Sequence, residues 1–187
     1  MPEPMTDTVF ELLSLECRVD SDGAILYYNA QGQIHRVHGP AVECPDGGSE
    51  WYQNGRLHRL DGPAIEGTDG YRAWYQNGEL HRLDGPAIEG TDGYRAWYQN
   101  GQLHRLDGPA IIHEDGYQSW YQHGERHRLD GPAVTHPDGY RVWWHNGQRH
   151  RIDGPAIEYV DGSSDWYVKG KSLSYAEWQQ VVSGIGE

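Results

Sequence analysis

The sequence has few of the residues that build an ordinary globular core. Only one of its 187 residues is Phe and two are Met, and the mean hydropathy is -0.84. Any core must therefore consist largely of the 13 Tyr and 8 Trp side chains, together with scattered Leu, Ile and Val. The two cysteines, Cys17 and Cys44, are too few for a disulfide framework.

Positive charge is scarce as well. The 15 Lys and Arg residues face 28 Asp and Glu residues, so the formal net charge is -13 with His neutral. Binding to nucleic-acid phosphate or to an anionic membrane needs a basic surface, so both are excluded as expected partners. A basic or neutral protein partner suits this charge better.

No targeting or membrane-spanning segment is predicted. The first residues, MPEPMTDTVFELLSLEC, lack the basic region that precedes the apolar run of a secretory signal. No stretch is apolar enough to span a bilayer. A cytoplasmic location is therefore the expectation.

The chain repeats itself with a period of 23 residues. One column of the repeat holds His35, His58, His81, His104, His127 and His150. Another holds Trp51, Trp74, Trp97, Trp120, Trp143 and Trp166. Internal repetition at this period predicts an array of small supersecondary units in which each contacts only its neighbours.

Each repeat contains two turn signals, such as Asn77-Gly78 and Asp92-Gly93, with strand-like runs between them. Both dipeptides favour two-residue hairpin loops. The first turn would place Tyr75 opposite Leu80 and Trp74 opposite His81, and the second would place Ile88 opposite Trp97. The Asp-Gly-Pro segment that follows each Arg should interrupt the return strand, because Pro cannot donate to a β-ladder.

We therefore predict an all-β protein, an elongated antiparallel β-hairpin repeat array with a short C-terminal capping helix. The array should span residues 22–170, with an N-terminal cap at 1–21 and a helical cap at 171–187. Ser174 and Glu177 have the spacing of a capping box, and Leu173 and Trp178 that of a hydrophobic staple. Residues 9–19 would form the N-terminal cap, either as a helix or as a strand.

The order aromatic, Asn-Gly, Leu-His, Gly, aliphatic, Asp-Gly resembles the MORN repeat. The similarity is closest to the MORN-like repeats of bacterial and phage proteins, with units of the form WYxNGxxHRxDGPA, and it covers residues 22–170. The chain departs from the standard unit in having Arg-Leu-Asp-Gly-Pro-Ala in place of a compact Gly-x-Gly. The resemblance implies an extended hairpin sheet used for scaffolding, dimerisation or lipid contact.

The recurring His-Arg-x-Asp segment could hold a metal or act in acid-base catalysis. Equivalent residues of successive repeats lie two strands apart, about 9.5 Å, whereas the ligands of a zinc ion lie about 2 Å from it. We therefore favour a structural role, in which each His stacks on the facing Trp and Arg82 pairs with Asp84. A nucleophile elbow, a phosphate-binding loop, a paired-cysteine motif and a His-Glu-x-x-His helix are all lacking. No enzymatic activity, cofactor or metal is predicted.

Departures from the repeat gather in residues 112–150. Two His residues stand where earlier repeats have Gly, and two Arg residues stand where earlier repeats have Leu. Two further His residues replace a turn Asn and a Gln, and Trp144 stands where earlier repeats have Tyr. Trp and Arg are favoured at binding hot spots, so this region is the predicted contact surface; neutral drift of older copies is the alternative. The candidate partner-binding residues are Arg126, Trp144, Arg149, His113, His136, His123 and His145.

The function predicted from these features is a non-enzymatic scaffold for protein-protein interaction, with homodimer formation through sheet edges as a further possibility. Two alternatives stay open. One is an acidic immunity-type or inhibitor protein that blocks a basic toxin, nuclease or defence enzyme. The other is an aromatic-ladder module that binds choline or a glycan, because short repeats with Trp-Tyr and Asn-Gly resemble choline- and glucan-binding repeats.

Overall fold

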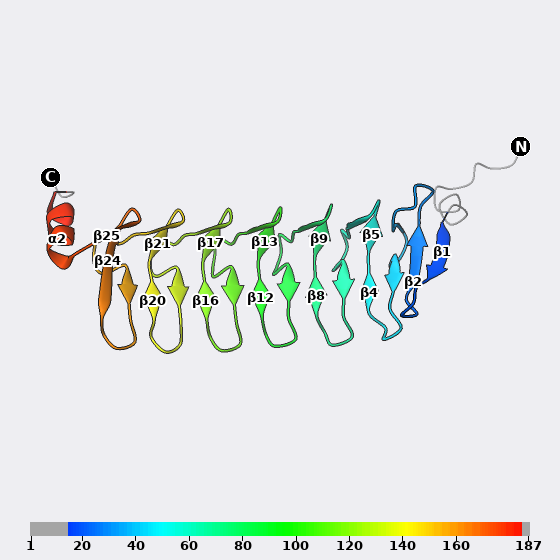
Figure 1. Cartoon of the computed structure of the whole chain (residues 1–187), viewed down its shortest axis with the longest axis horizontal. Coiled ribbons are helices and arrows are strands. Elements are labelled where there is room, and N and C mark those ends of the chain that lie inside the picture. The colour runs from blue at the N-terminus through cyan, green and yellow to red at the C-terminus, as the bar shows by residue number, and fades with distance from the viewer. Residues whose placement is uncertain (1–14, 185–187) are drawn as a thin grey trace, which may run out of the picture. The chain divides into compact units, whose positions relative to one another are not determined.

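The computed structural model describes residues 15–184, which belong to two compact units, Met1–Thr91 (unit 1) and Asp92–Glu187 (unit 2). Each unit is a row of antiparallel hairpins (Figure 1), and one short helix follows the last hairpin. The predicted all-β hairpin array with a C-terminal helix is therefore confirmed. No helix within residues 15–184 has the length and hydrophobicity needed to cross a bilayer.

Unit 1 contains a main sheet and two small hairpins. The sheet has the order β1 (Glu16–Val19), β2 (Ile25–Tyr28), β3 (Val42–Glu43), β4 (Ser49–Glu50), β7 (Ile65–Glu66), β8 (Arg72–Ala73) and β11 (Ile88–Glu89). The small hairpins are β5 (Tyr52–Gln53) with β6 (Arg56–Leu57), and β9 (Tyr75–Gln76) with β10 (Glu79–Leu80). Each repeat thus contributes two strands to the sheet and one small hairpin beside it.

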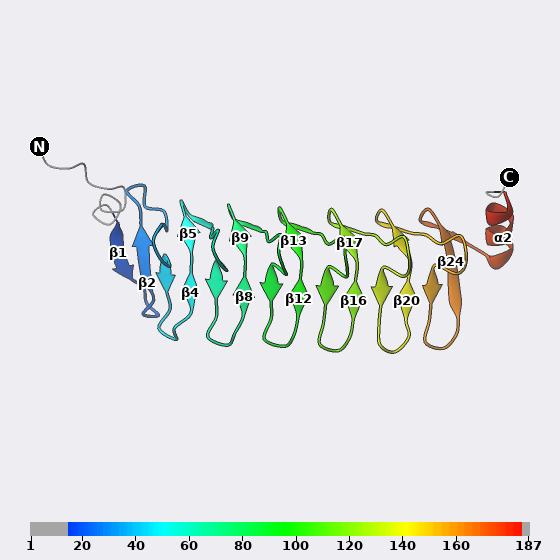
Figure 2. The same ribbon diagram turned by 180° about the vertical axis from the view of Figure 1, so that it is seen from behind.

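Unit 2 repeats this plan. Its main sheet has the order β12 (Arg95–Ala96), β15 (Ile111–Ile112), β16 (Gln118–Ser119), β19 (Val134–Thr135), β20 (Arg141–Val142), β23 (Ile157–Glu158), β24 (Ser164–Val168) and β25 (Lys171–Leu173). Its small hairpins are β13 (Tyr98–Gln99) with β14 (Gln102–Leu103), β17 (Tyr121–Gln122) with β18 (Glu125–Arg126), and β21 (Trp144–His145) with β22 (Gln148–Arg149). Within the unit, the small hairpins lie along one long side and the loops of the main sheet along the other (Figures 1 and 2).

The small hairpins close through the predicted Asn-Gly turns. Asn77 has φ 54° and Gly78 has φ 87°, and positive φ at both positions is the requirement of a type I′ turn. Tyr75 lies opposite Leu80, as predicted. The backbone N–H of His81 donates to the carbonyl of Trp74 at 3.0 Å, which confirms the expected pairing of Trp74 with His81.

The predicted register of the Asp-Gly hairpins is wrong by one residue. In the equivalent loop of unit 1, the N–H of Gly67 donates to the carbonyl of Tyr71 at 2.9 Å, so three residues separate the two closing positions. Gly70 is the left-handed residue of this loop, with φ 94°. Ile65 consequently lies opposite Ala73 and not opposite the following Trp. A three-residue loop with a left-handed Gly is the common alternative to the two-residue turn.

The core is thin and is built mainly from alanine. The Ala of each Gly-Pro-Ala segment is fully buried: Ala41, Ala64, Ala87, Ala110, Ala133 and Ala156. The one cluster of larger buried side chains in residues 15–184 is Val134, Val142 and Ile157 in unit 2, with Trp144 and Tyr167 packed against it. Small buried residues allow the sheet and the small hairpins to approach closely.

The predicted C-terminal cap is present as α2 (Tyr175–Ser183), which contacts β24 and β25. Ser174 and Glu177 form the capping box, with the Glu177 N–H donating to the Ser174 hydroxyl at 3.3 Å. Trp178 packs on Trp166, with ring centroids 4.3 Å apart. At the other end, residues 16–19 form strand β1, which pairs with β2, whereas the part of the expected N-terminal cap at 9–14 lies outside the described residues.

Candidate functional site

One face of five successive repeats is organised around an arginine that covers the repeated Trp. In unit 1 the Arg82 guanidinium carbon lies 3.8 Å from the centre of the Trp74 ring. Its Nε donates to Asp84 at 2.9 Å, as predicted, and its Nη1 donates to the Pro86 carbonyl at 3.1 Å and to Glu89 at 3.0 Å. Arginine, not the expected histidine, therefore stacks on the Trp. We call this side the tryptophan face.

The same arrangement recurs along the tryptophan face. The guanidinium carbon lies 3.8 to 4.1 Å above the Trp ring in the repeats of Arg59, Arg82, Arg105, Arg128 and Arg151. A Cβ at Gly85 would lie 2.9 Å from the Arg82 guanidinium carbon, so Gly at this position leaves room for the stacked side chain. The Asp-Gly-Pro segment that interrupts the strand thus lets the backbone pass closely around the Arg side chain.

The histidine column links successive repeats. Nδ1 of His58 accepts a hydrogen bond at 3.1 Å from the backbone N–H of Asn77, in the turn of the next small hairpin. His127 accepts from Asn146 in the same way at 3.2 Å. Since Nδ1 acts as an acceptor, these rings must be unprotonated at that atom. The structural role predicted for the column is therefore seen, although by hydrogen bonding and not by stacking.

The residue between Arg and Asp points into solvent in each of these repeats. The exposed fraction is 75% for Leu60, 74% for Leu83, 74% for Leu106 and 78% for Leu129, and it is 45% for Ile152. We call this set of five side chains the aliphatic ridge. Single exposed apolar residues are common, but a column of large aliphatic side chains exposed at one position per repeat is typical of an interaction site.

Clefts open between successive members of the ridge. In unit 1 a cleft of about 450 Å³ between Leu60 and Leu83 is lined by Trp74 and Gln76. In unit 2 a cleft of about 620 Å³ between Leu106 and Leu129 has the equivalent lining. In each unit, therefore, two exposed leucines of the ridge are separated by a cleft that is lined by a Trp side chain.

The carboxylates beside the ridge are exposed, whereas the arginines are covered. The Asp84 side chain is 85% exposed and the Arg82 side chain 21%. A hydrogen bond from Arg82 lowers the pKa of the Asp84 carboxyl below its usual value, so this group is ionised at neutral pH. The other four Asp residues of this column, Asp61, Asp107, Asp130 and Asp153, have their pKa lowered by the same kind of bond.

Three of the predicted partner-binding residues lie together on the opposite face of the small hairpins. Trp144 lies opposite Arg149 on β21 and β22, and the guanidinium carbons of Arg126 and Arg149 lie 5.5 and 5.4 Å from a Trp144 ring. Arg126 also donates to the Tyr121 hydroxyl at 3.0 Å. Trp144 packs against the buried Val134, Val142 and Ile157 cluster, so much of its ring is committed to the core.

His113 and His136 lie along the loops of the main sheet in unit 2. Tyr117 lies between them, with ring centroids 4.9 Å from His113 and 4.8 Å from His136. The row continues through Tyr140, 5.4 Å from His136, and Tyr159, 5.7 Å from Tyr140. Edge-to-face contacts of this kind stabilise neighbouring loops.

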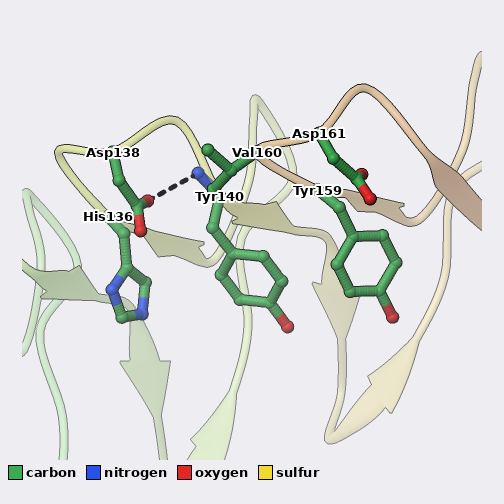
Figure 3. A pocket seen from close by; sticks show the side chains of 6 residues that line it. All are labelled: His136, Asp138, Tyr140, Tyr159, Val160 and Asp161. Carbon is green, nitrogen blue, oxygen red and sulfur yellow. Dashed lines mark hydrogen bonds between the residues drawn. The ribbon is translucent and has the colours of Figure 1, made fainter.

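A pocket of about 420 Å³ lies at the end of this row (Figure 3) and is bounded by His136, Tyr140, Tyr159, Val160 and two carboxylates. The three rings lie side by side in Figure 3. Asp138 caps its loop by accepting from the Tyr140 N–H at 2.9 Å. Asp161 accepts from Ser163 in the next loop.

The last two predicted residues are elsewhere. His145 lies between His127 and His150, with ring centroids 4.9 and 5.7 Å away, on the side of its hairpin opposite to Trp144. His123 occupies a turn position with φ 50°, where its N–H donates to His104 Nδ1 at 3.2 Å. The seven candidates therefore do not share one face.

Burial is the main cause that lowers the pKa of His104, and the neighbouring His123 lowers it further. Burial likewise lowers the pKa of His150, with contributions from His145 and Lys169. Despite these imidazole clusters, residues 15–184 contain no group of three or more His, Cys, Asp or Glu side chains that could hold a metal ion.

Sequence reasoning did not find the aliphatic ridge. A signal for it exists, because the position after the repeated Arg is Val37, Leu60, Leu83, Leu106, Leu129 and Ile152 in turn, always aliphatic. An aliphatic residue in a strand-like run is usually assigned to the core, and only the wrapping of the backbone around the Arg turns it outward. The chain matches no protein-family model, and a search of curated proteins likewise finds no match.

Proposed function

We propose that this chain is a non-enzymatic, MORN-like repeat scaffold that binds a protein partner through the aliphatic ridge. The observation that carries the proposal is the exposure of 74 to 78% at four leucines in consecutive repeats. Burying a large aliphatic side chain yields about 1.5–3 kcal/mol. Covering such a surface with a partner is favourable, and within each unit one contact per repeat adds to the free energy of binding.

The test compares two variants of the intact chain. The ridge variant carries Leu60→Ser, Leu83→Ser, Leu106→Ser and Leu129→Ser. The control variant carries Val19→Ser, which replaces an aliphatic residue that is 67% exposed away from the ridge. Both should keep the wild-type circular dichroism spectrum and melting temperature, because the replaced side chains are mainly in solvent.

In affinity capture followed by mass spectrometry, the ridge variant should lose the partner that wild type and control retain. A third variant, with Arg126→Ala, Trp144→Ala and Arg149→Ala, tests the opposite face. If that variant loses the partner while the ridge variant keeps it, the contact surface is the one predicted from the diverged residues 112–150, and the ridge proposal fails.

The acidic-inhibitor hypothesis also predicts a protein partner but a different kind of binding. Attraction of a basic enzyme by a charge of -13 would weaken steeply as salt is raised. Ridge binding buries apolar surface, so it should keep part of its affinity between about 0.1 and 0.5 M salt and should be lost in the ridge variant at either concentration. Affinity measured across this range separates the two hypotheses.

A second candidate function rests on the loop pocket. Its aromatic walls and two carboxylates have the composition of a site for a small cation such as choline. Two observations weigh against it: the Tyr140 and Tyr159 rings are in contact with one another, and Asp138 is engaged in capping its loop. Choline titration followed by NMR, with Tyr159→Ala as the control, would detect binding at this pocket.

The homodimer through sheet edges is a separate proposal about the same scaffold. Sedimentation velocity over a range of concentrations tests it directly. A single monomer boundary at all concentrations would remove it without affecting the ridge.

A further inference from the structure

The spacing of the ridge restricts the conformation of what binds it. Within unit 1, equivalent strands β7 and β11 are separated by β8, so successive repeats lie two strand spacings apart. Within unit 2, β15 and β19 are separated by β16 in the same manner. Two spacings correspond to about 9.6 Å. A ligand that makes the same contact with each repeat must present equivalent side chains at this interval.

The polyproline II helix matches this interval. It has three residues per turn and rises about 9.3 Å per turn, so every third residue returns to the same side. The accumulated mismatch is about 0.3 Å per repeat, which side chains can absorb.

Other regular conformations fit less well. Side chains of an α-helix return to the same face after seven residues, a rise of about 10.5 Å, and the mismatch is about three times larger. In an extended β-strand equivalent side chains recur every second residue, at about 6.7 Å, or every fourth, at about 13 Å.

The clefts have side chains suited to such a ligand. Trp74 and Gln76 line the cleft between Leu60 and Leu83, and both carry N–H donors. A polyproline II segment exposes its backbone carbonyl acceptors, and proline offers no competing N–H. Aromatic-lined grooves are the usual receptors for this conformation.

The exposed charges beside the ridge predict the charge of the ligand's remaining side chains. At each step of the ridge a carboxylate is the outermost charged group: the Asp61 and Asp84 side chains are 85% exposed, while Arg59 and Arg82 are 21% exposed beneath them. In unit 2 Asp107 and Asp130 are 83% exposed. A Lys or Arg at one of the two remaining positions of each turn would meet these carboxylates.

We infer that, within each unit, the aliphatic ridge binds a cationic polyproline II segment, one turn per repeat, with an apolar residue in the cleft and a basic residue beside each exposed Asp. This inference rests on the proposed function, because it identifies the kind of partner that the ridge would take.

The test measures binding of labelled peptides to the intact chain by fluorescence anisotropy. The periodic peptide is (Pro-Pro-Lys)₄. A permuted peptide of the same composition, with its lysines in one block, keeps the charge and loses the period. (Pro-Pro-Glu)₄ keeps the period and reverses the charge, and a Leu/Lys heptad peptide is the helical competitor.

The periodic peptide should bind about tenfold more tightly than the permuted one, and its affinity should rise as turns are added from one to three, the number of ridge positions in unit 2. The ridge variant should lose about tenfold or more of this affinity, and the Val19→Ser control should lose none. Equal binding of the periodic and permuted peptides, or tighter binding of the helical peptide, would overturn the inference.

The inference and the proposed function can fail separately. If no periodic peptide binds but the ridge variant still loses its captured partner, the ridge is an interaction surface for a different conformation, and the polyproline assignment is wrong. If the ridge variant keeps every partner and every peptide affinity, the proposed function is wrong as well.

Discussion

The two units share one face and differ on the other. On the tryptophan face, unit 1 and unit 2 have the same Arg over the same Trp and the same exposed aliphatic residue. On the opposite face, a Tyr lies opposite a Leu in unit 1 (Tyr75 and Leu80) and in the first small hairpin of unit 2. In the two later hairpins of unit 2, Tyr121 lies opposite Arg126 and Trp144 opposite Arg149. The repeats therefore have the same residues on the tryptophan face, where the Arg stacks on the Trp and turns the ridge residue outward. Their residues differ on the opposite face, which takes no part in that packing.

The loops of the main sheet also differ between the two units, because unit 2 has larger and more polar residues in them. The position that closes the loop is Gly67 in unit 1 and His113 or His136 in unit 2, and the two His rings join a continuous row with tyrosines. The shared face is thus suited to a contact repeated in every copy, and the diverged face of unit 2 to contacts that occur once.

The largest expected effect is a loss of stability when the arginine that both units share on the tryptophan face is removed. Arg82→Ala should lower the free energy of unfolding by about 2 kcal/mol, because a stacked cation and hydrogen bonds to charged groups are lost together. Arg128→Ala in unit 2 should cost roughly half as much, since Thr135 stands where unit 1 has a Glu partner. Urea unfolding measures both.

Arg72→Ala is the matched control for this pair, because Arg72 is 57% exposed and its contact to Glu89 is 3.8 Å long. It should change stability by less than about 0.5 kcal/mol. A loss as large as that of Arg82→Ala would mean that stacking on Trp contributes little.

The next effect concerns the diverged face. Arg149→Leu restores the residue type of unit 1, and Nε of Arg149 is buried without a hydrogen-bond partner. The replacement should stabilise the protein by about 1 kcal/mol by removing an unpaired polar group from the interior. A fall in stability, measured by thermal unfolding, would show that the contacts of Arg149 with Trp144 and Tyr167 outweigh this cost.

A smaller gain is expected at a turn. His123 has φ 50°, a conformation that Asn adopts in the equivalent turns of unit 1. His123→Asn should raise the free energy of unfolding by about 0.5 kcal/mol, since Asn tolerates the left-handed region better than His. Asn77→His in unit 1 is the reciprocal change and should lower it by a similar amount.

The smallest expected difference between the units is in their response to acid. The folded-state pKa values of His104 and His150 are lowered, chiefly by burial, so folding favours the neutral rings. Their contribution to stability is complete above the unfolded-state pKa of about 6.5 and declines as the pH falls below it. Hydrogen exchange at pH 7 and pH 5 should therefore show a greater loss of protection around these residues than around Arg59 and Trp74.

The local features of the fold were predictable from sequence. The period locates the repeats, and Asn77-Gly78 specifies its own turn because the two residues tolerate positive φ. Ser174 and Glu177 specify the helix start through bonds that span three residues. The register at Asp69-Gly70 was not predictable, since the Asp carboxylate bonds the Tyr71 N–H and opens the loop to three residues.

The candidate site was predicted less well. The diverged residues were correctly recognised as departures, and alternation along a strand is enough to assign Trp144 and His145 to opposite sides of one hairpin. The sequence did not show that His113 lies on a different edge. It also gave the recurring His-Arg-x-Asp segment a purely structural role, although the residue between Arg and Asp in that segment is the exposed leucine.

The sequence by itself determined a 23-residue hairpin unit, its type I′ turns and its helical end, because these depend on backbone preferences and hydrogen bonds between close neighbours in the chain. The tertiary structure decided which side chains face solvent. Arg82 reaches back to Trp74 and forward to Glu89, and the backbone that wraps around it turns Leu83 outward. That outcome depends on packing between segments that meet only after the repeat has folded.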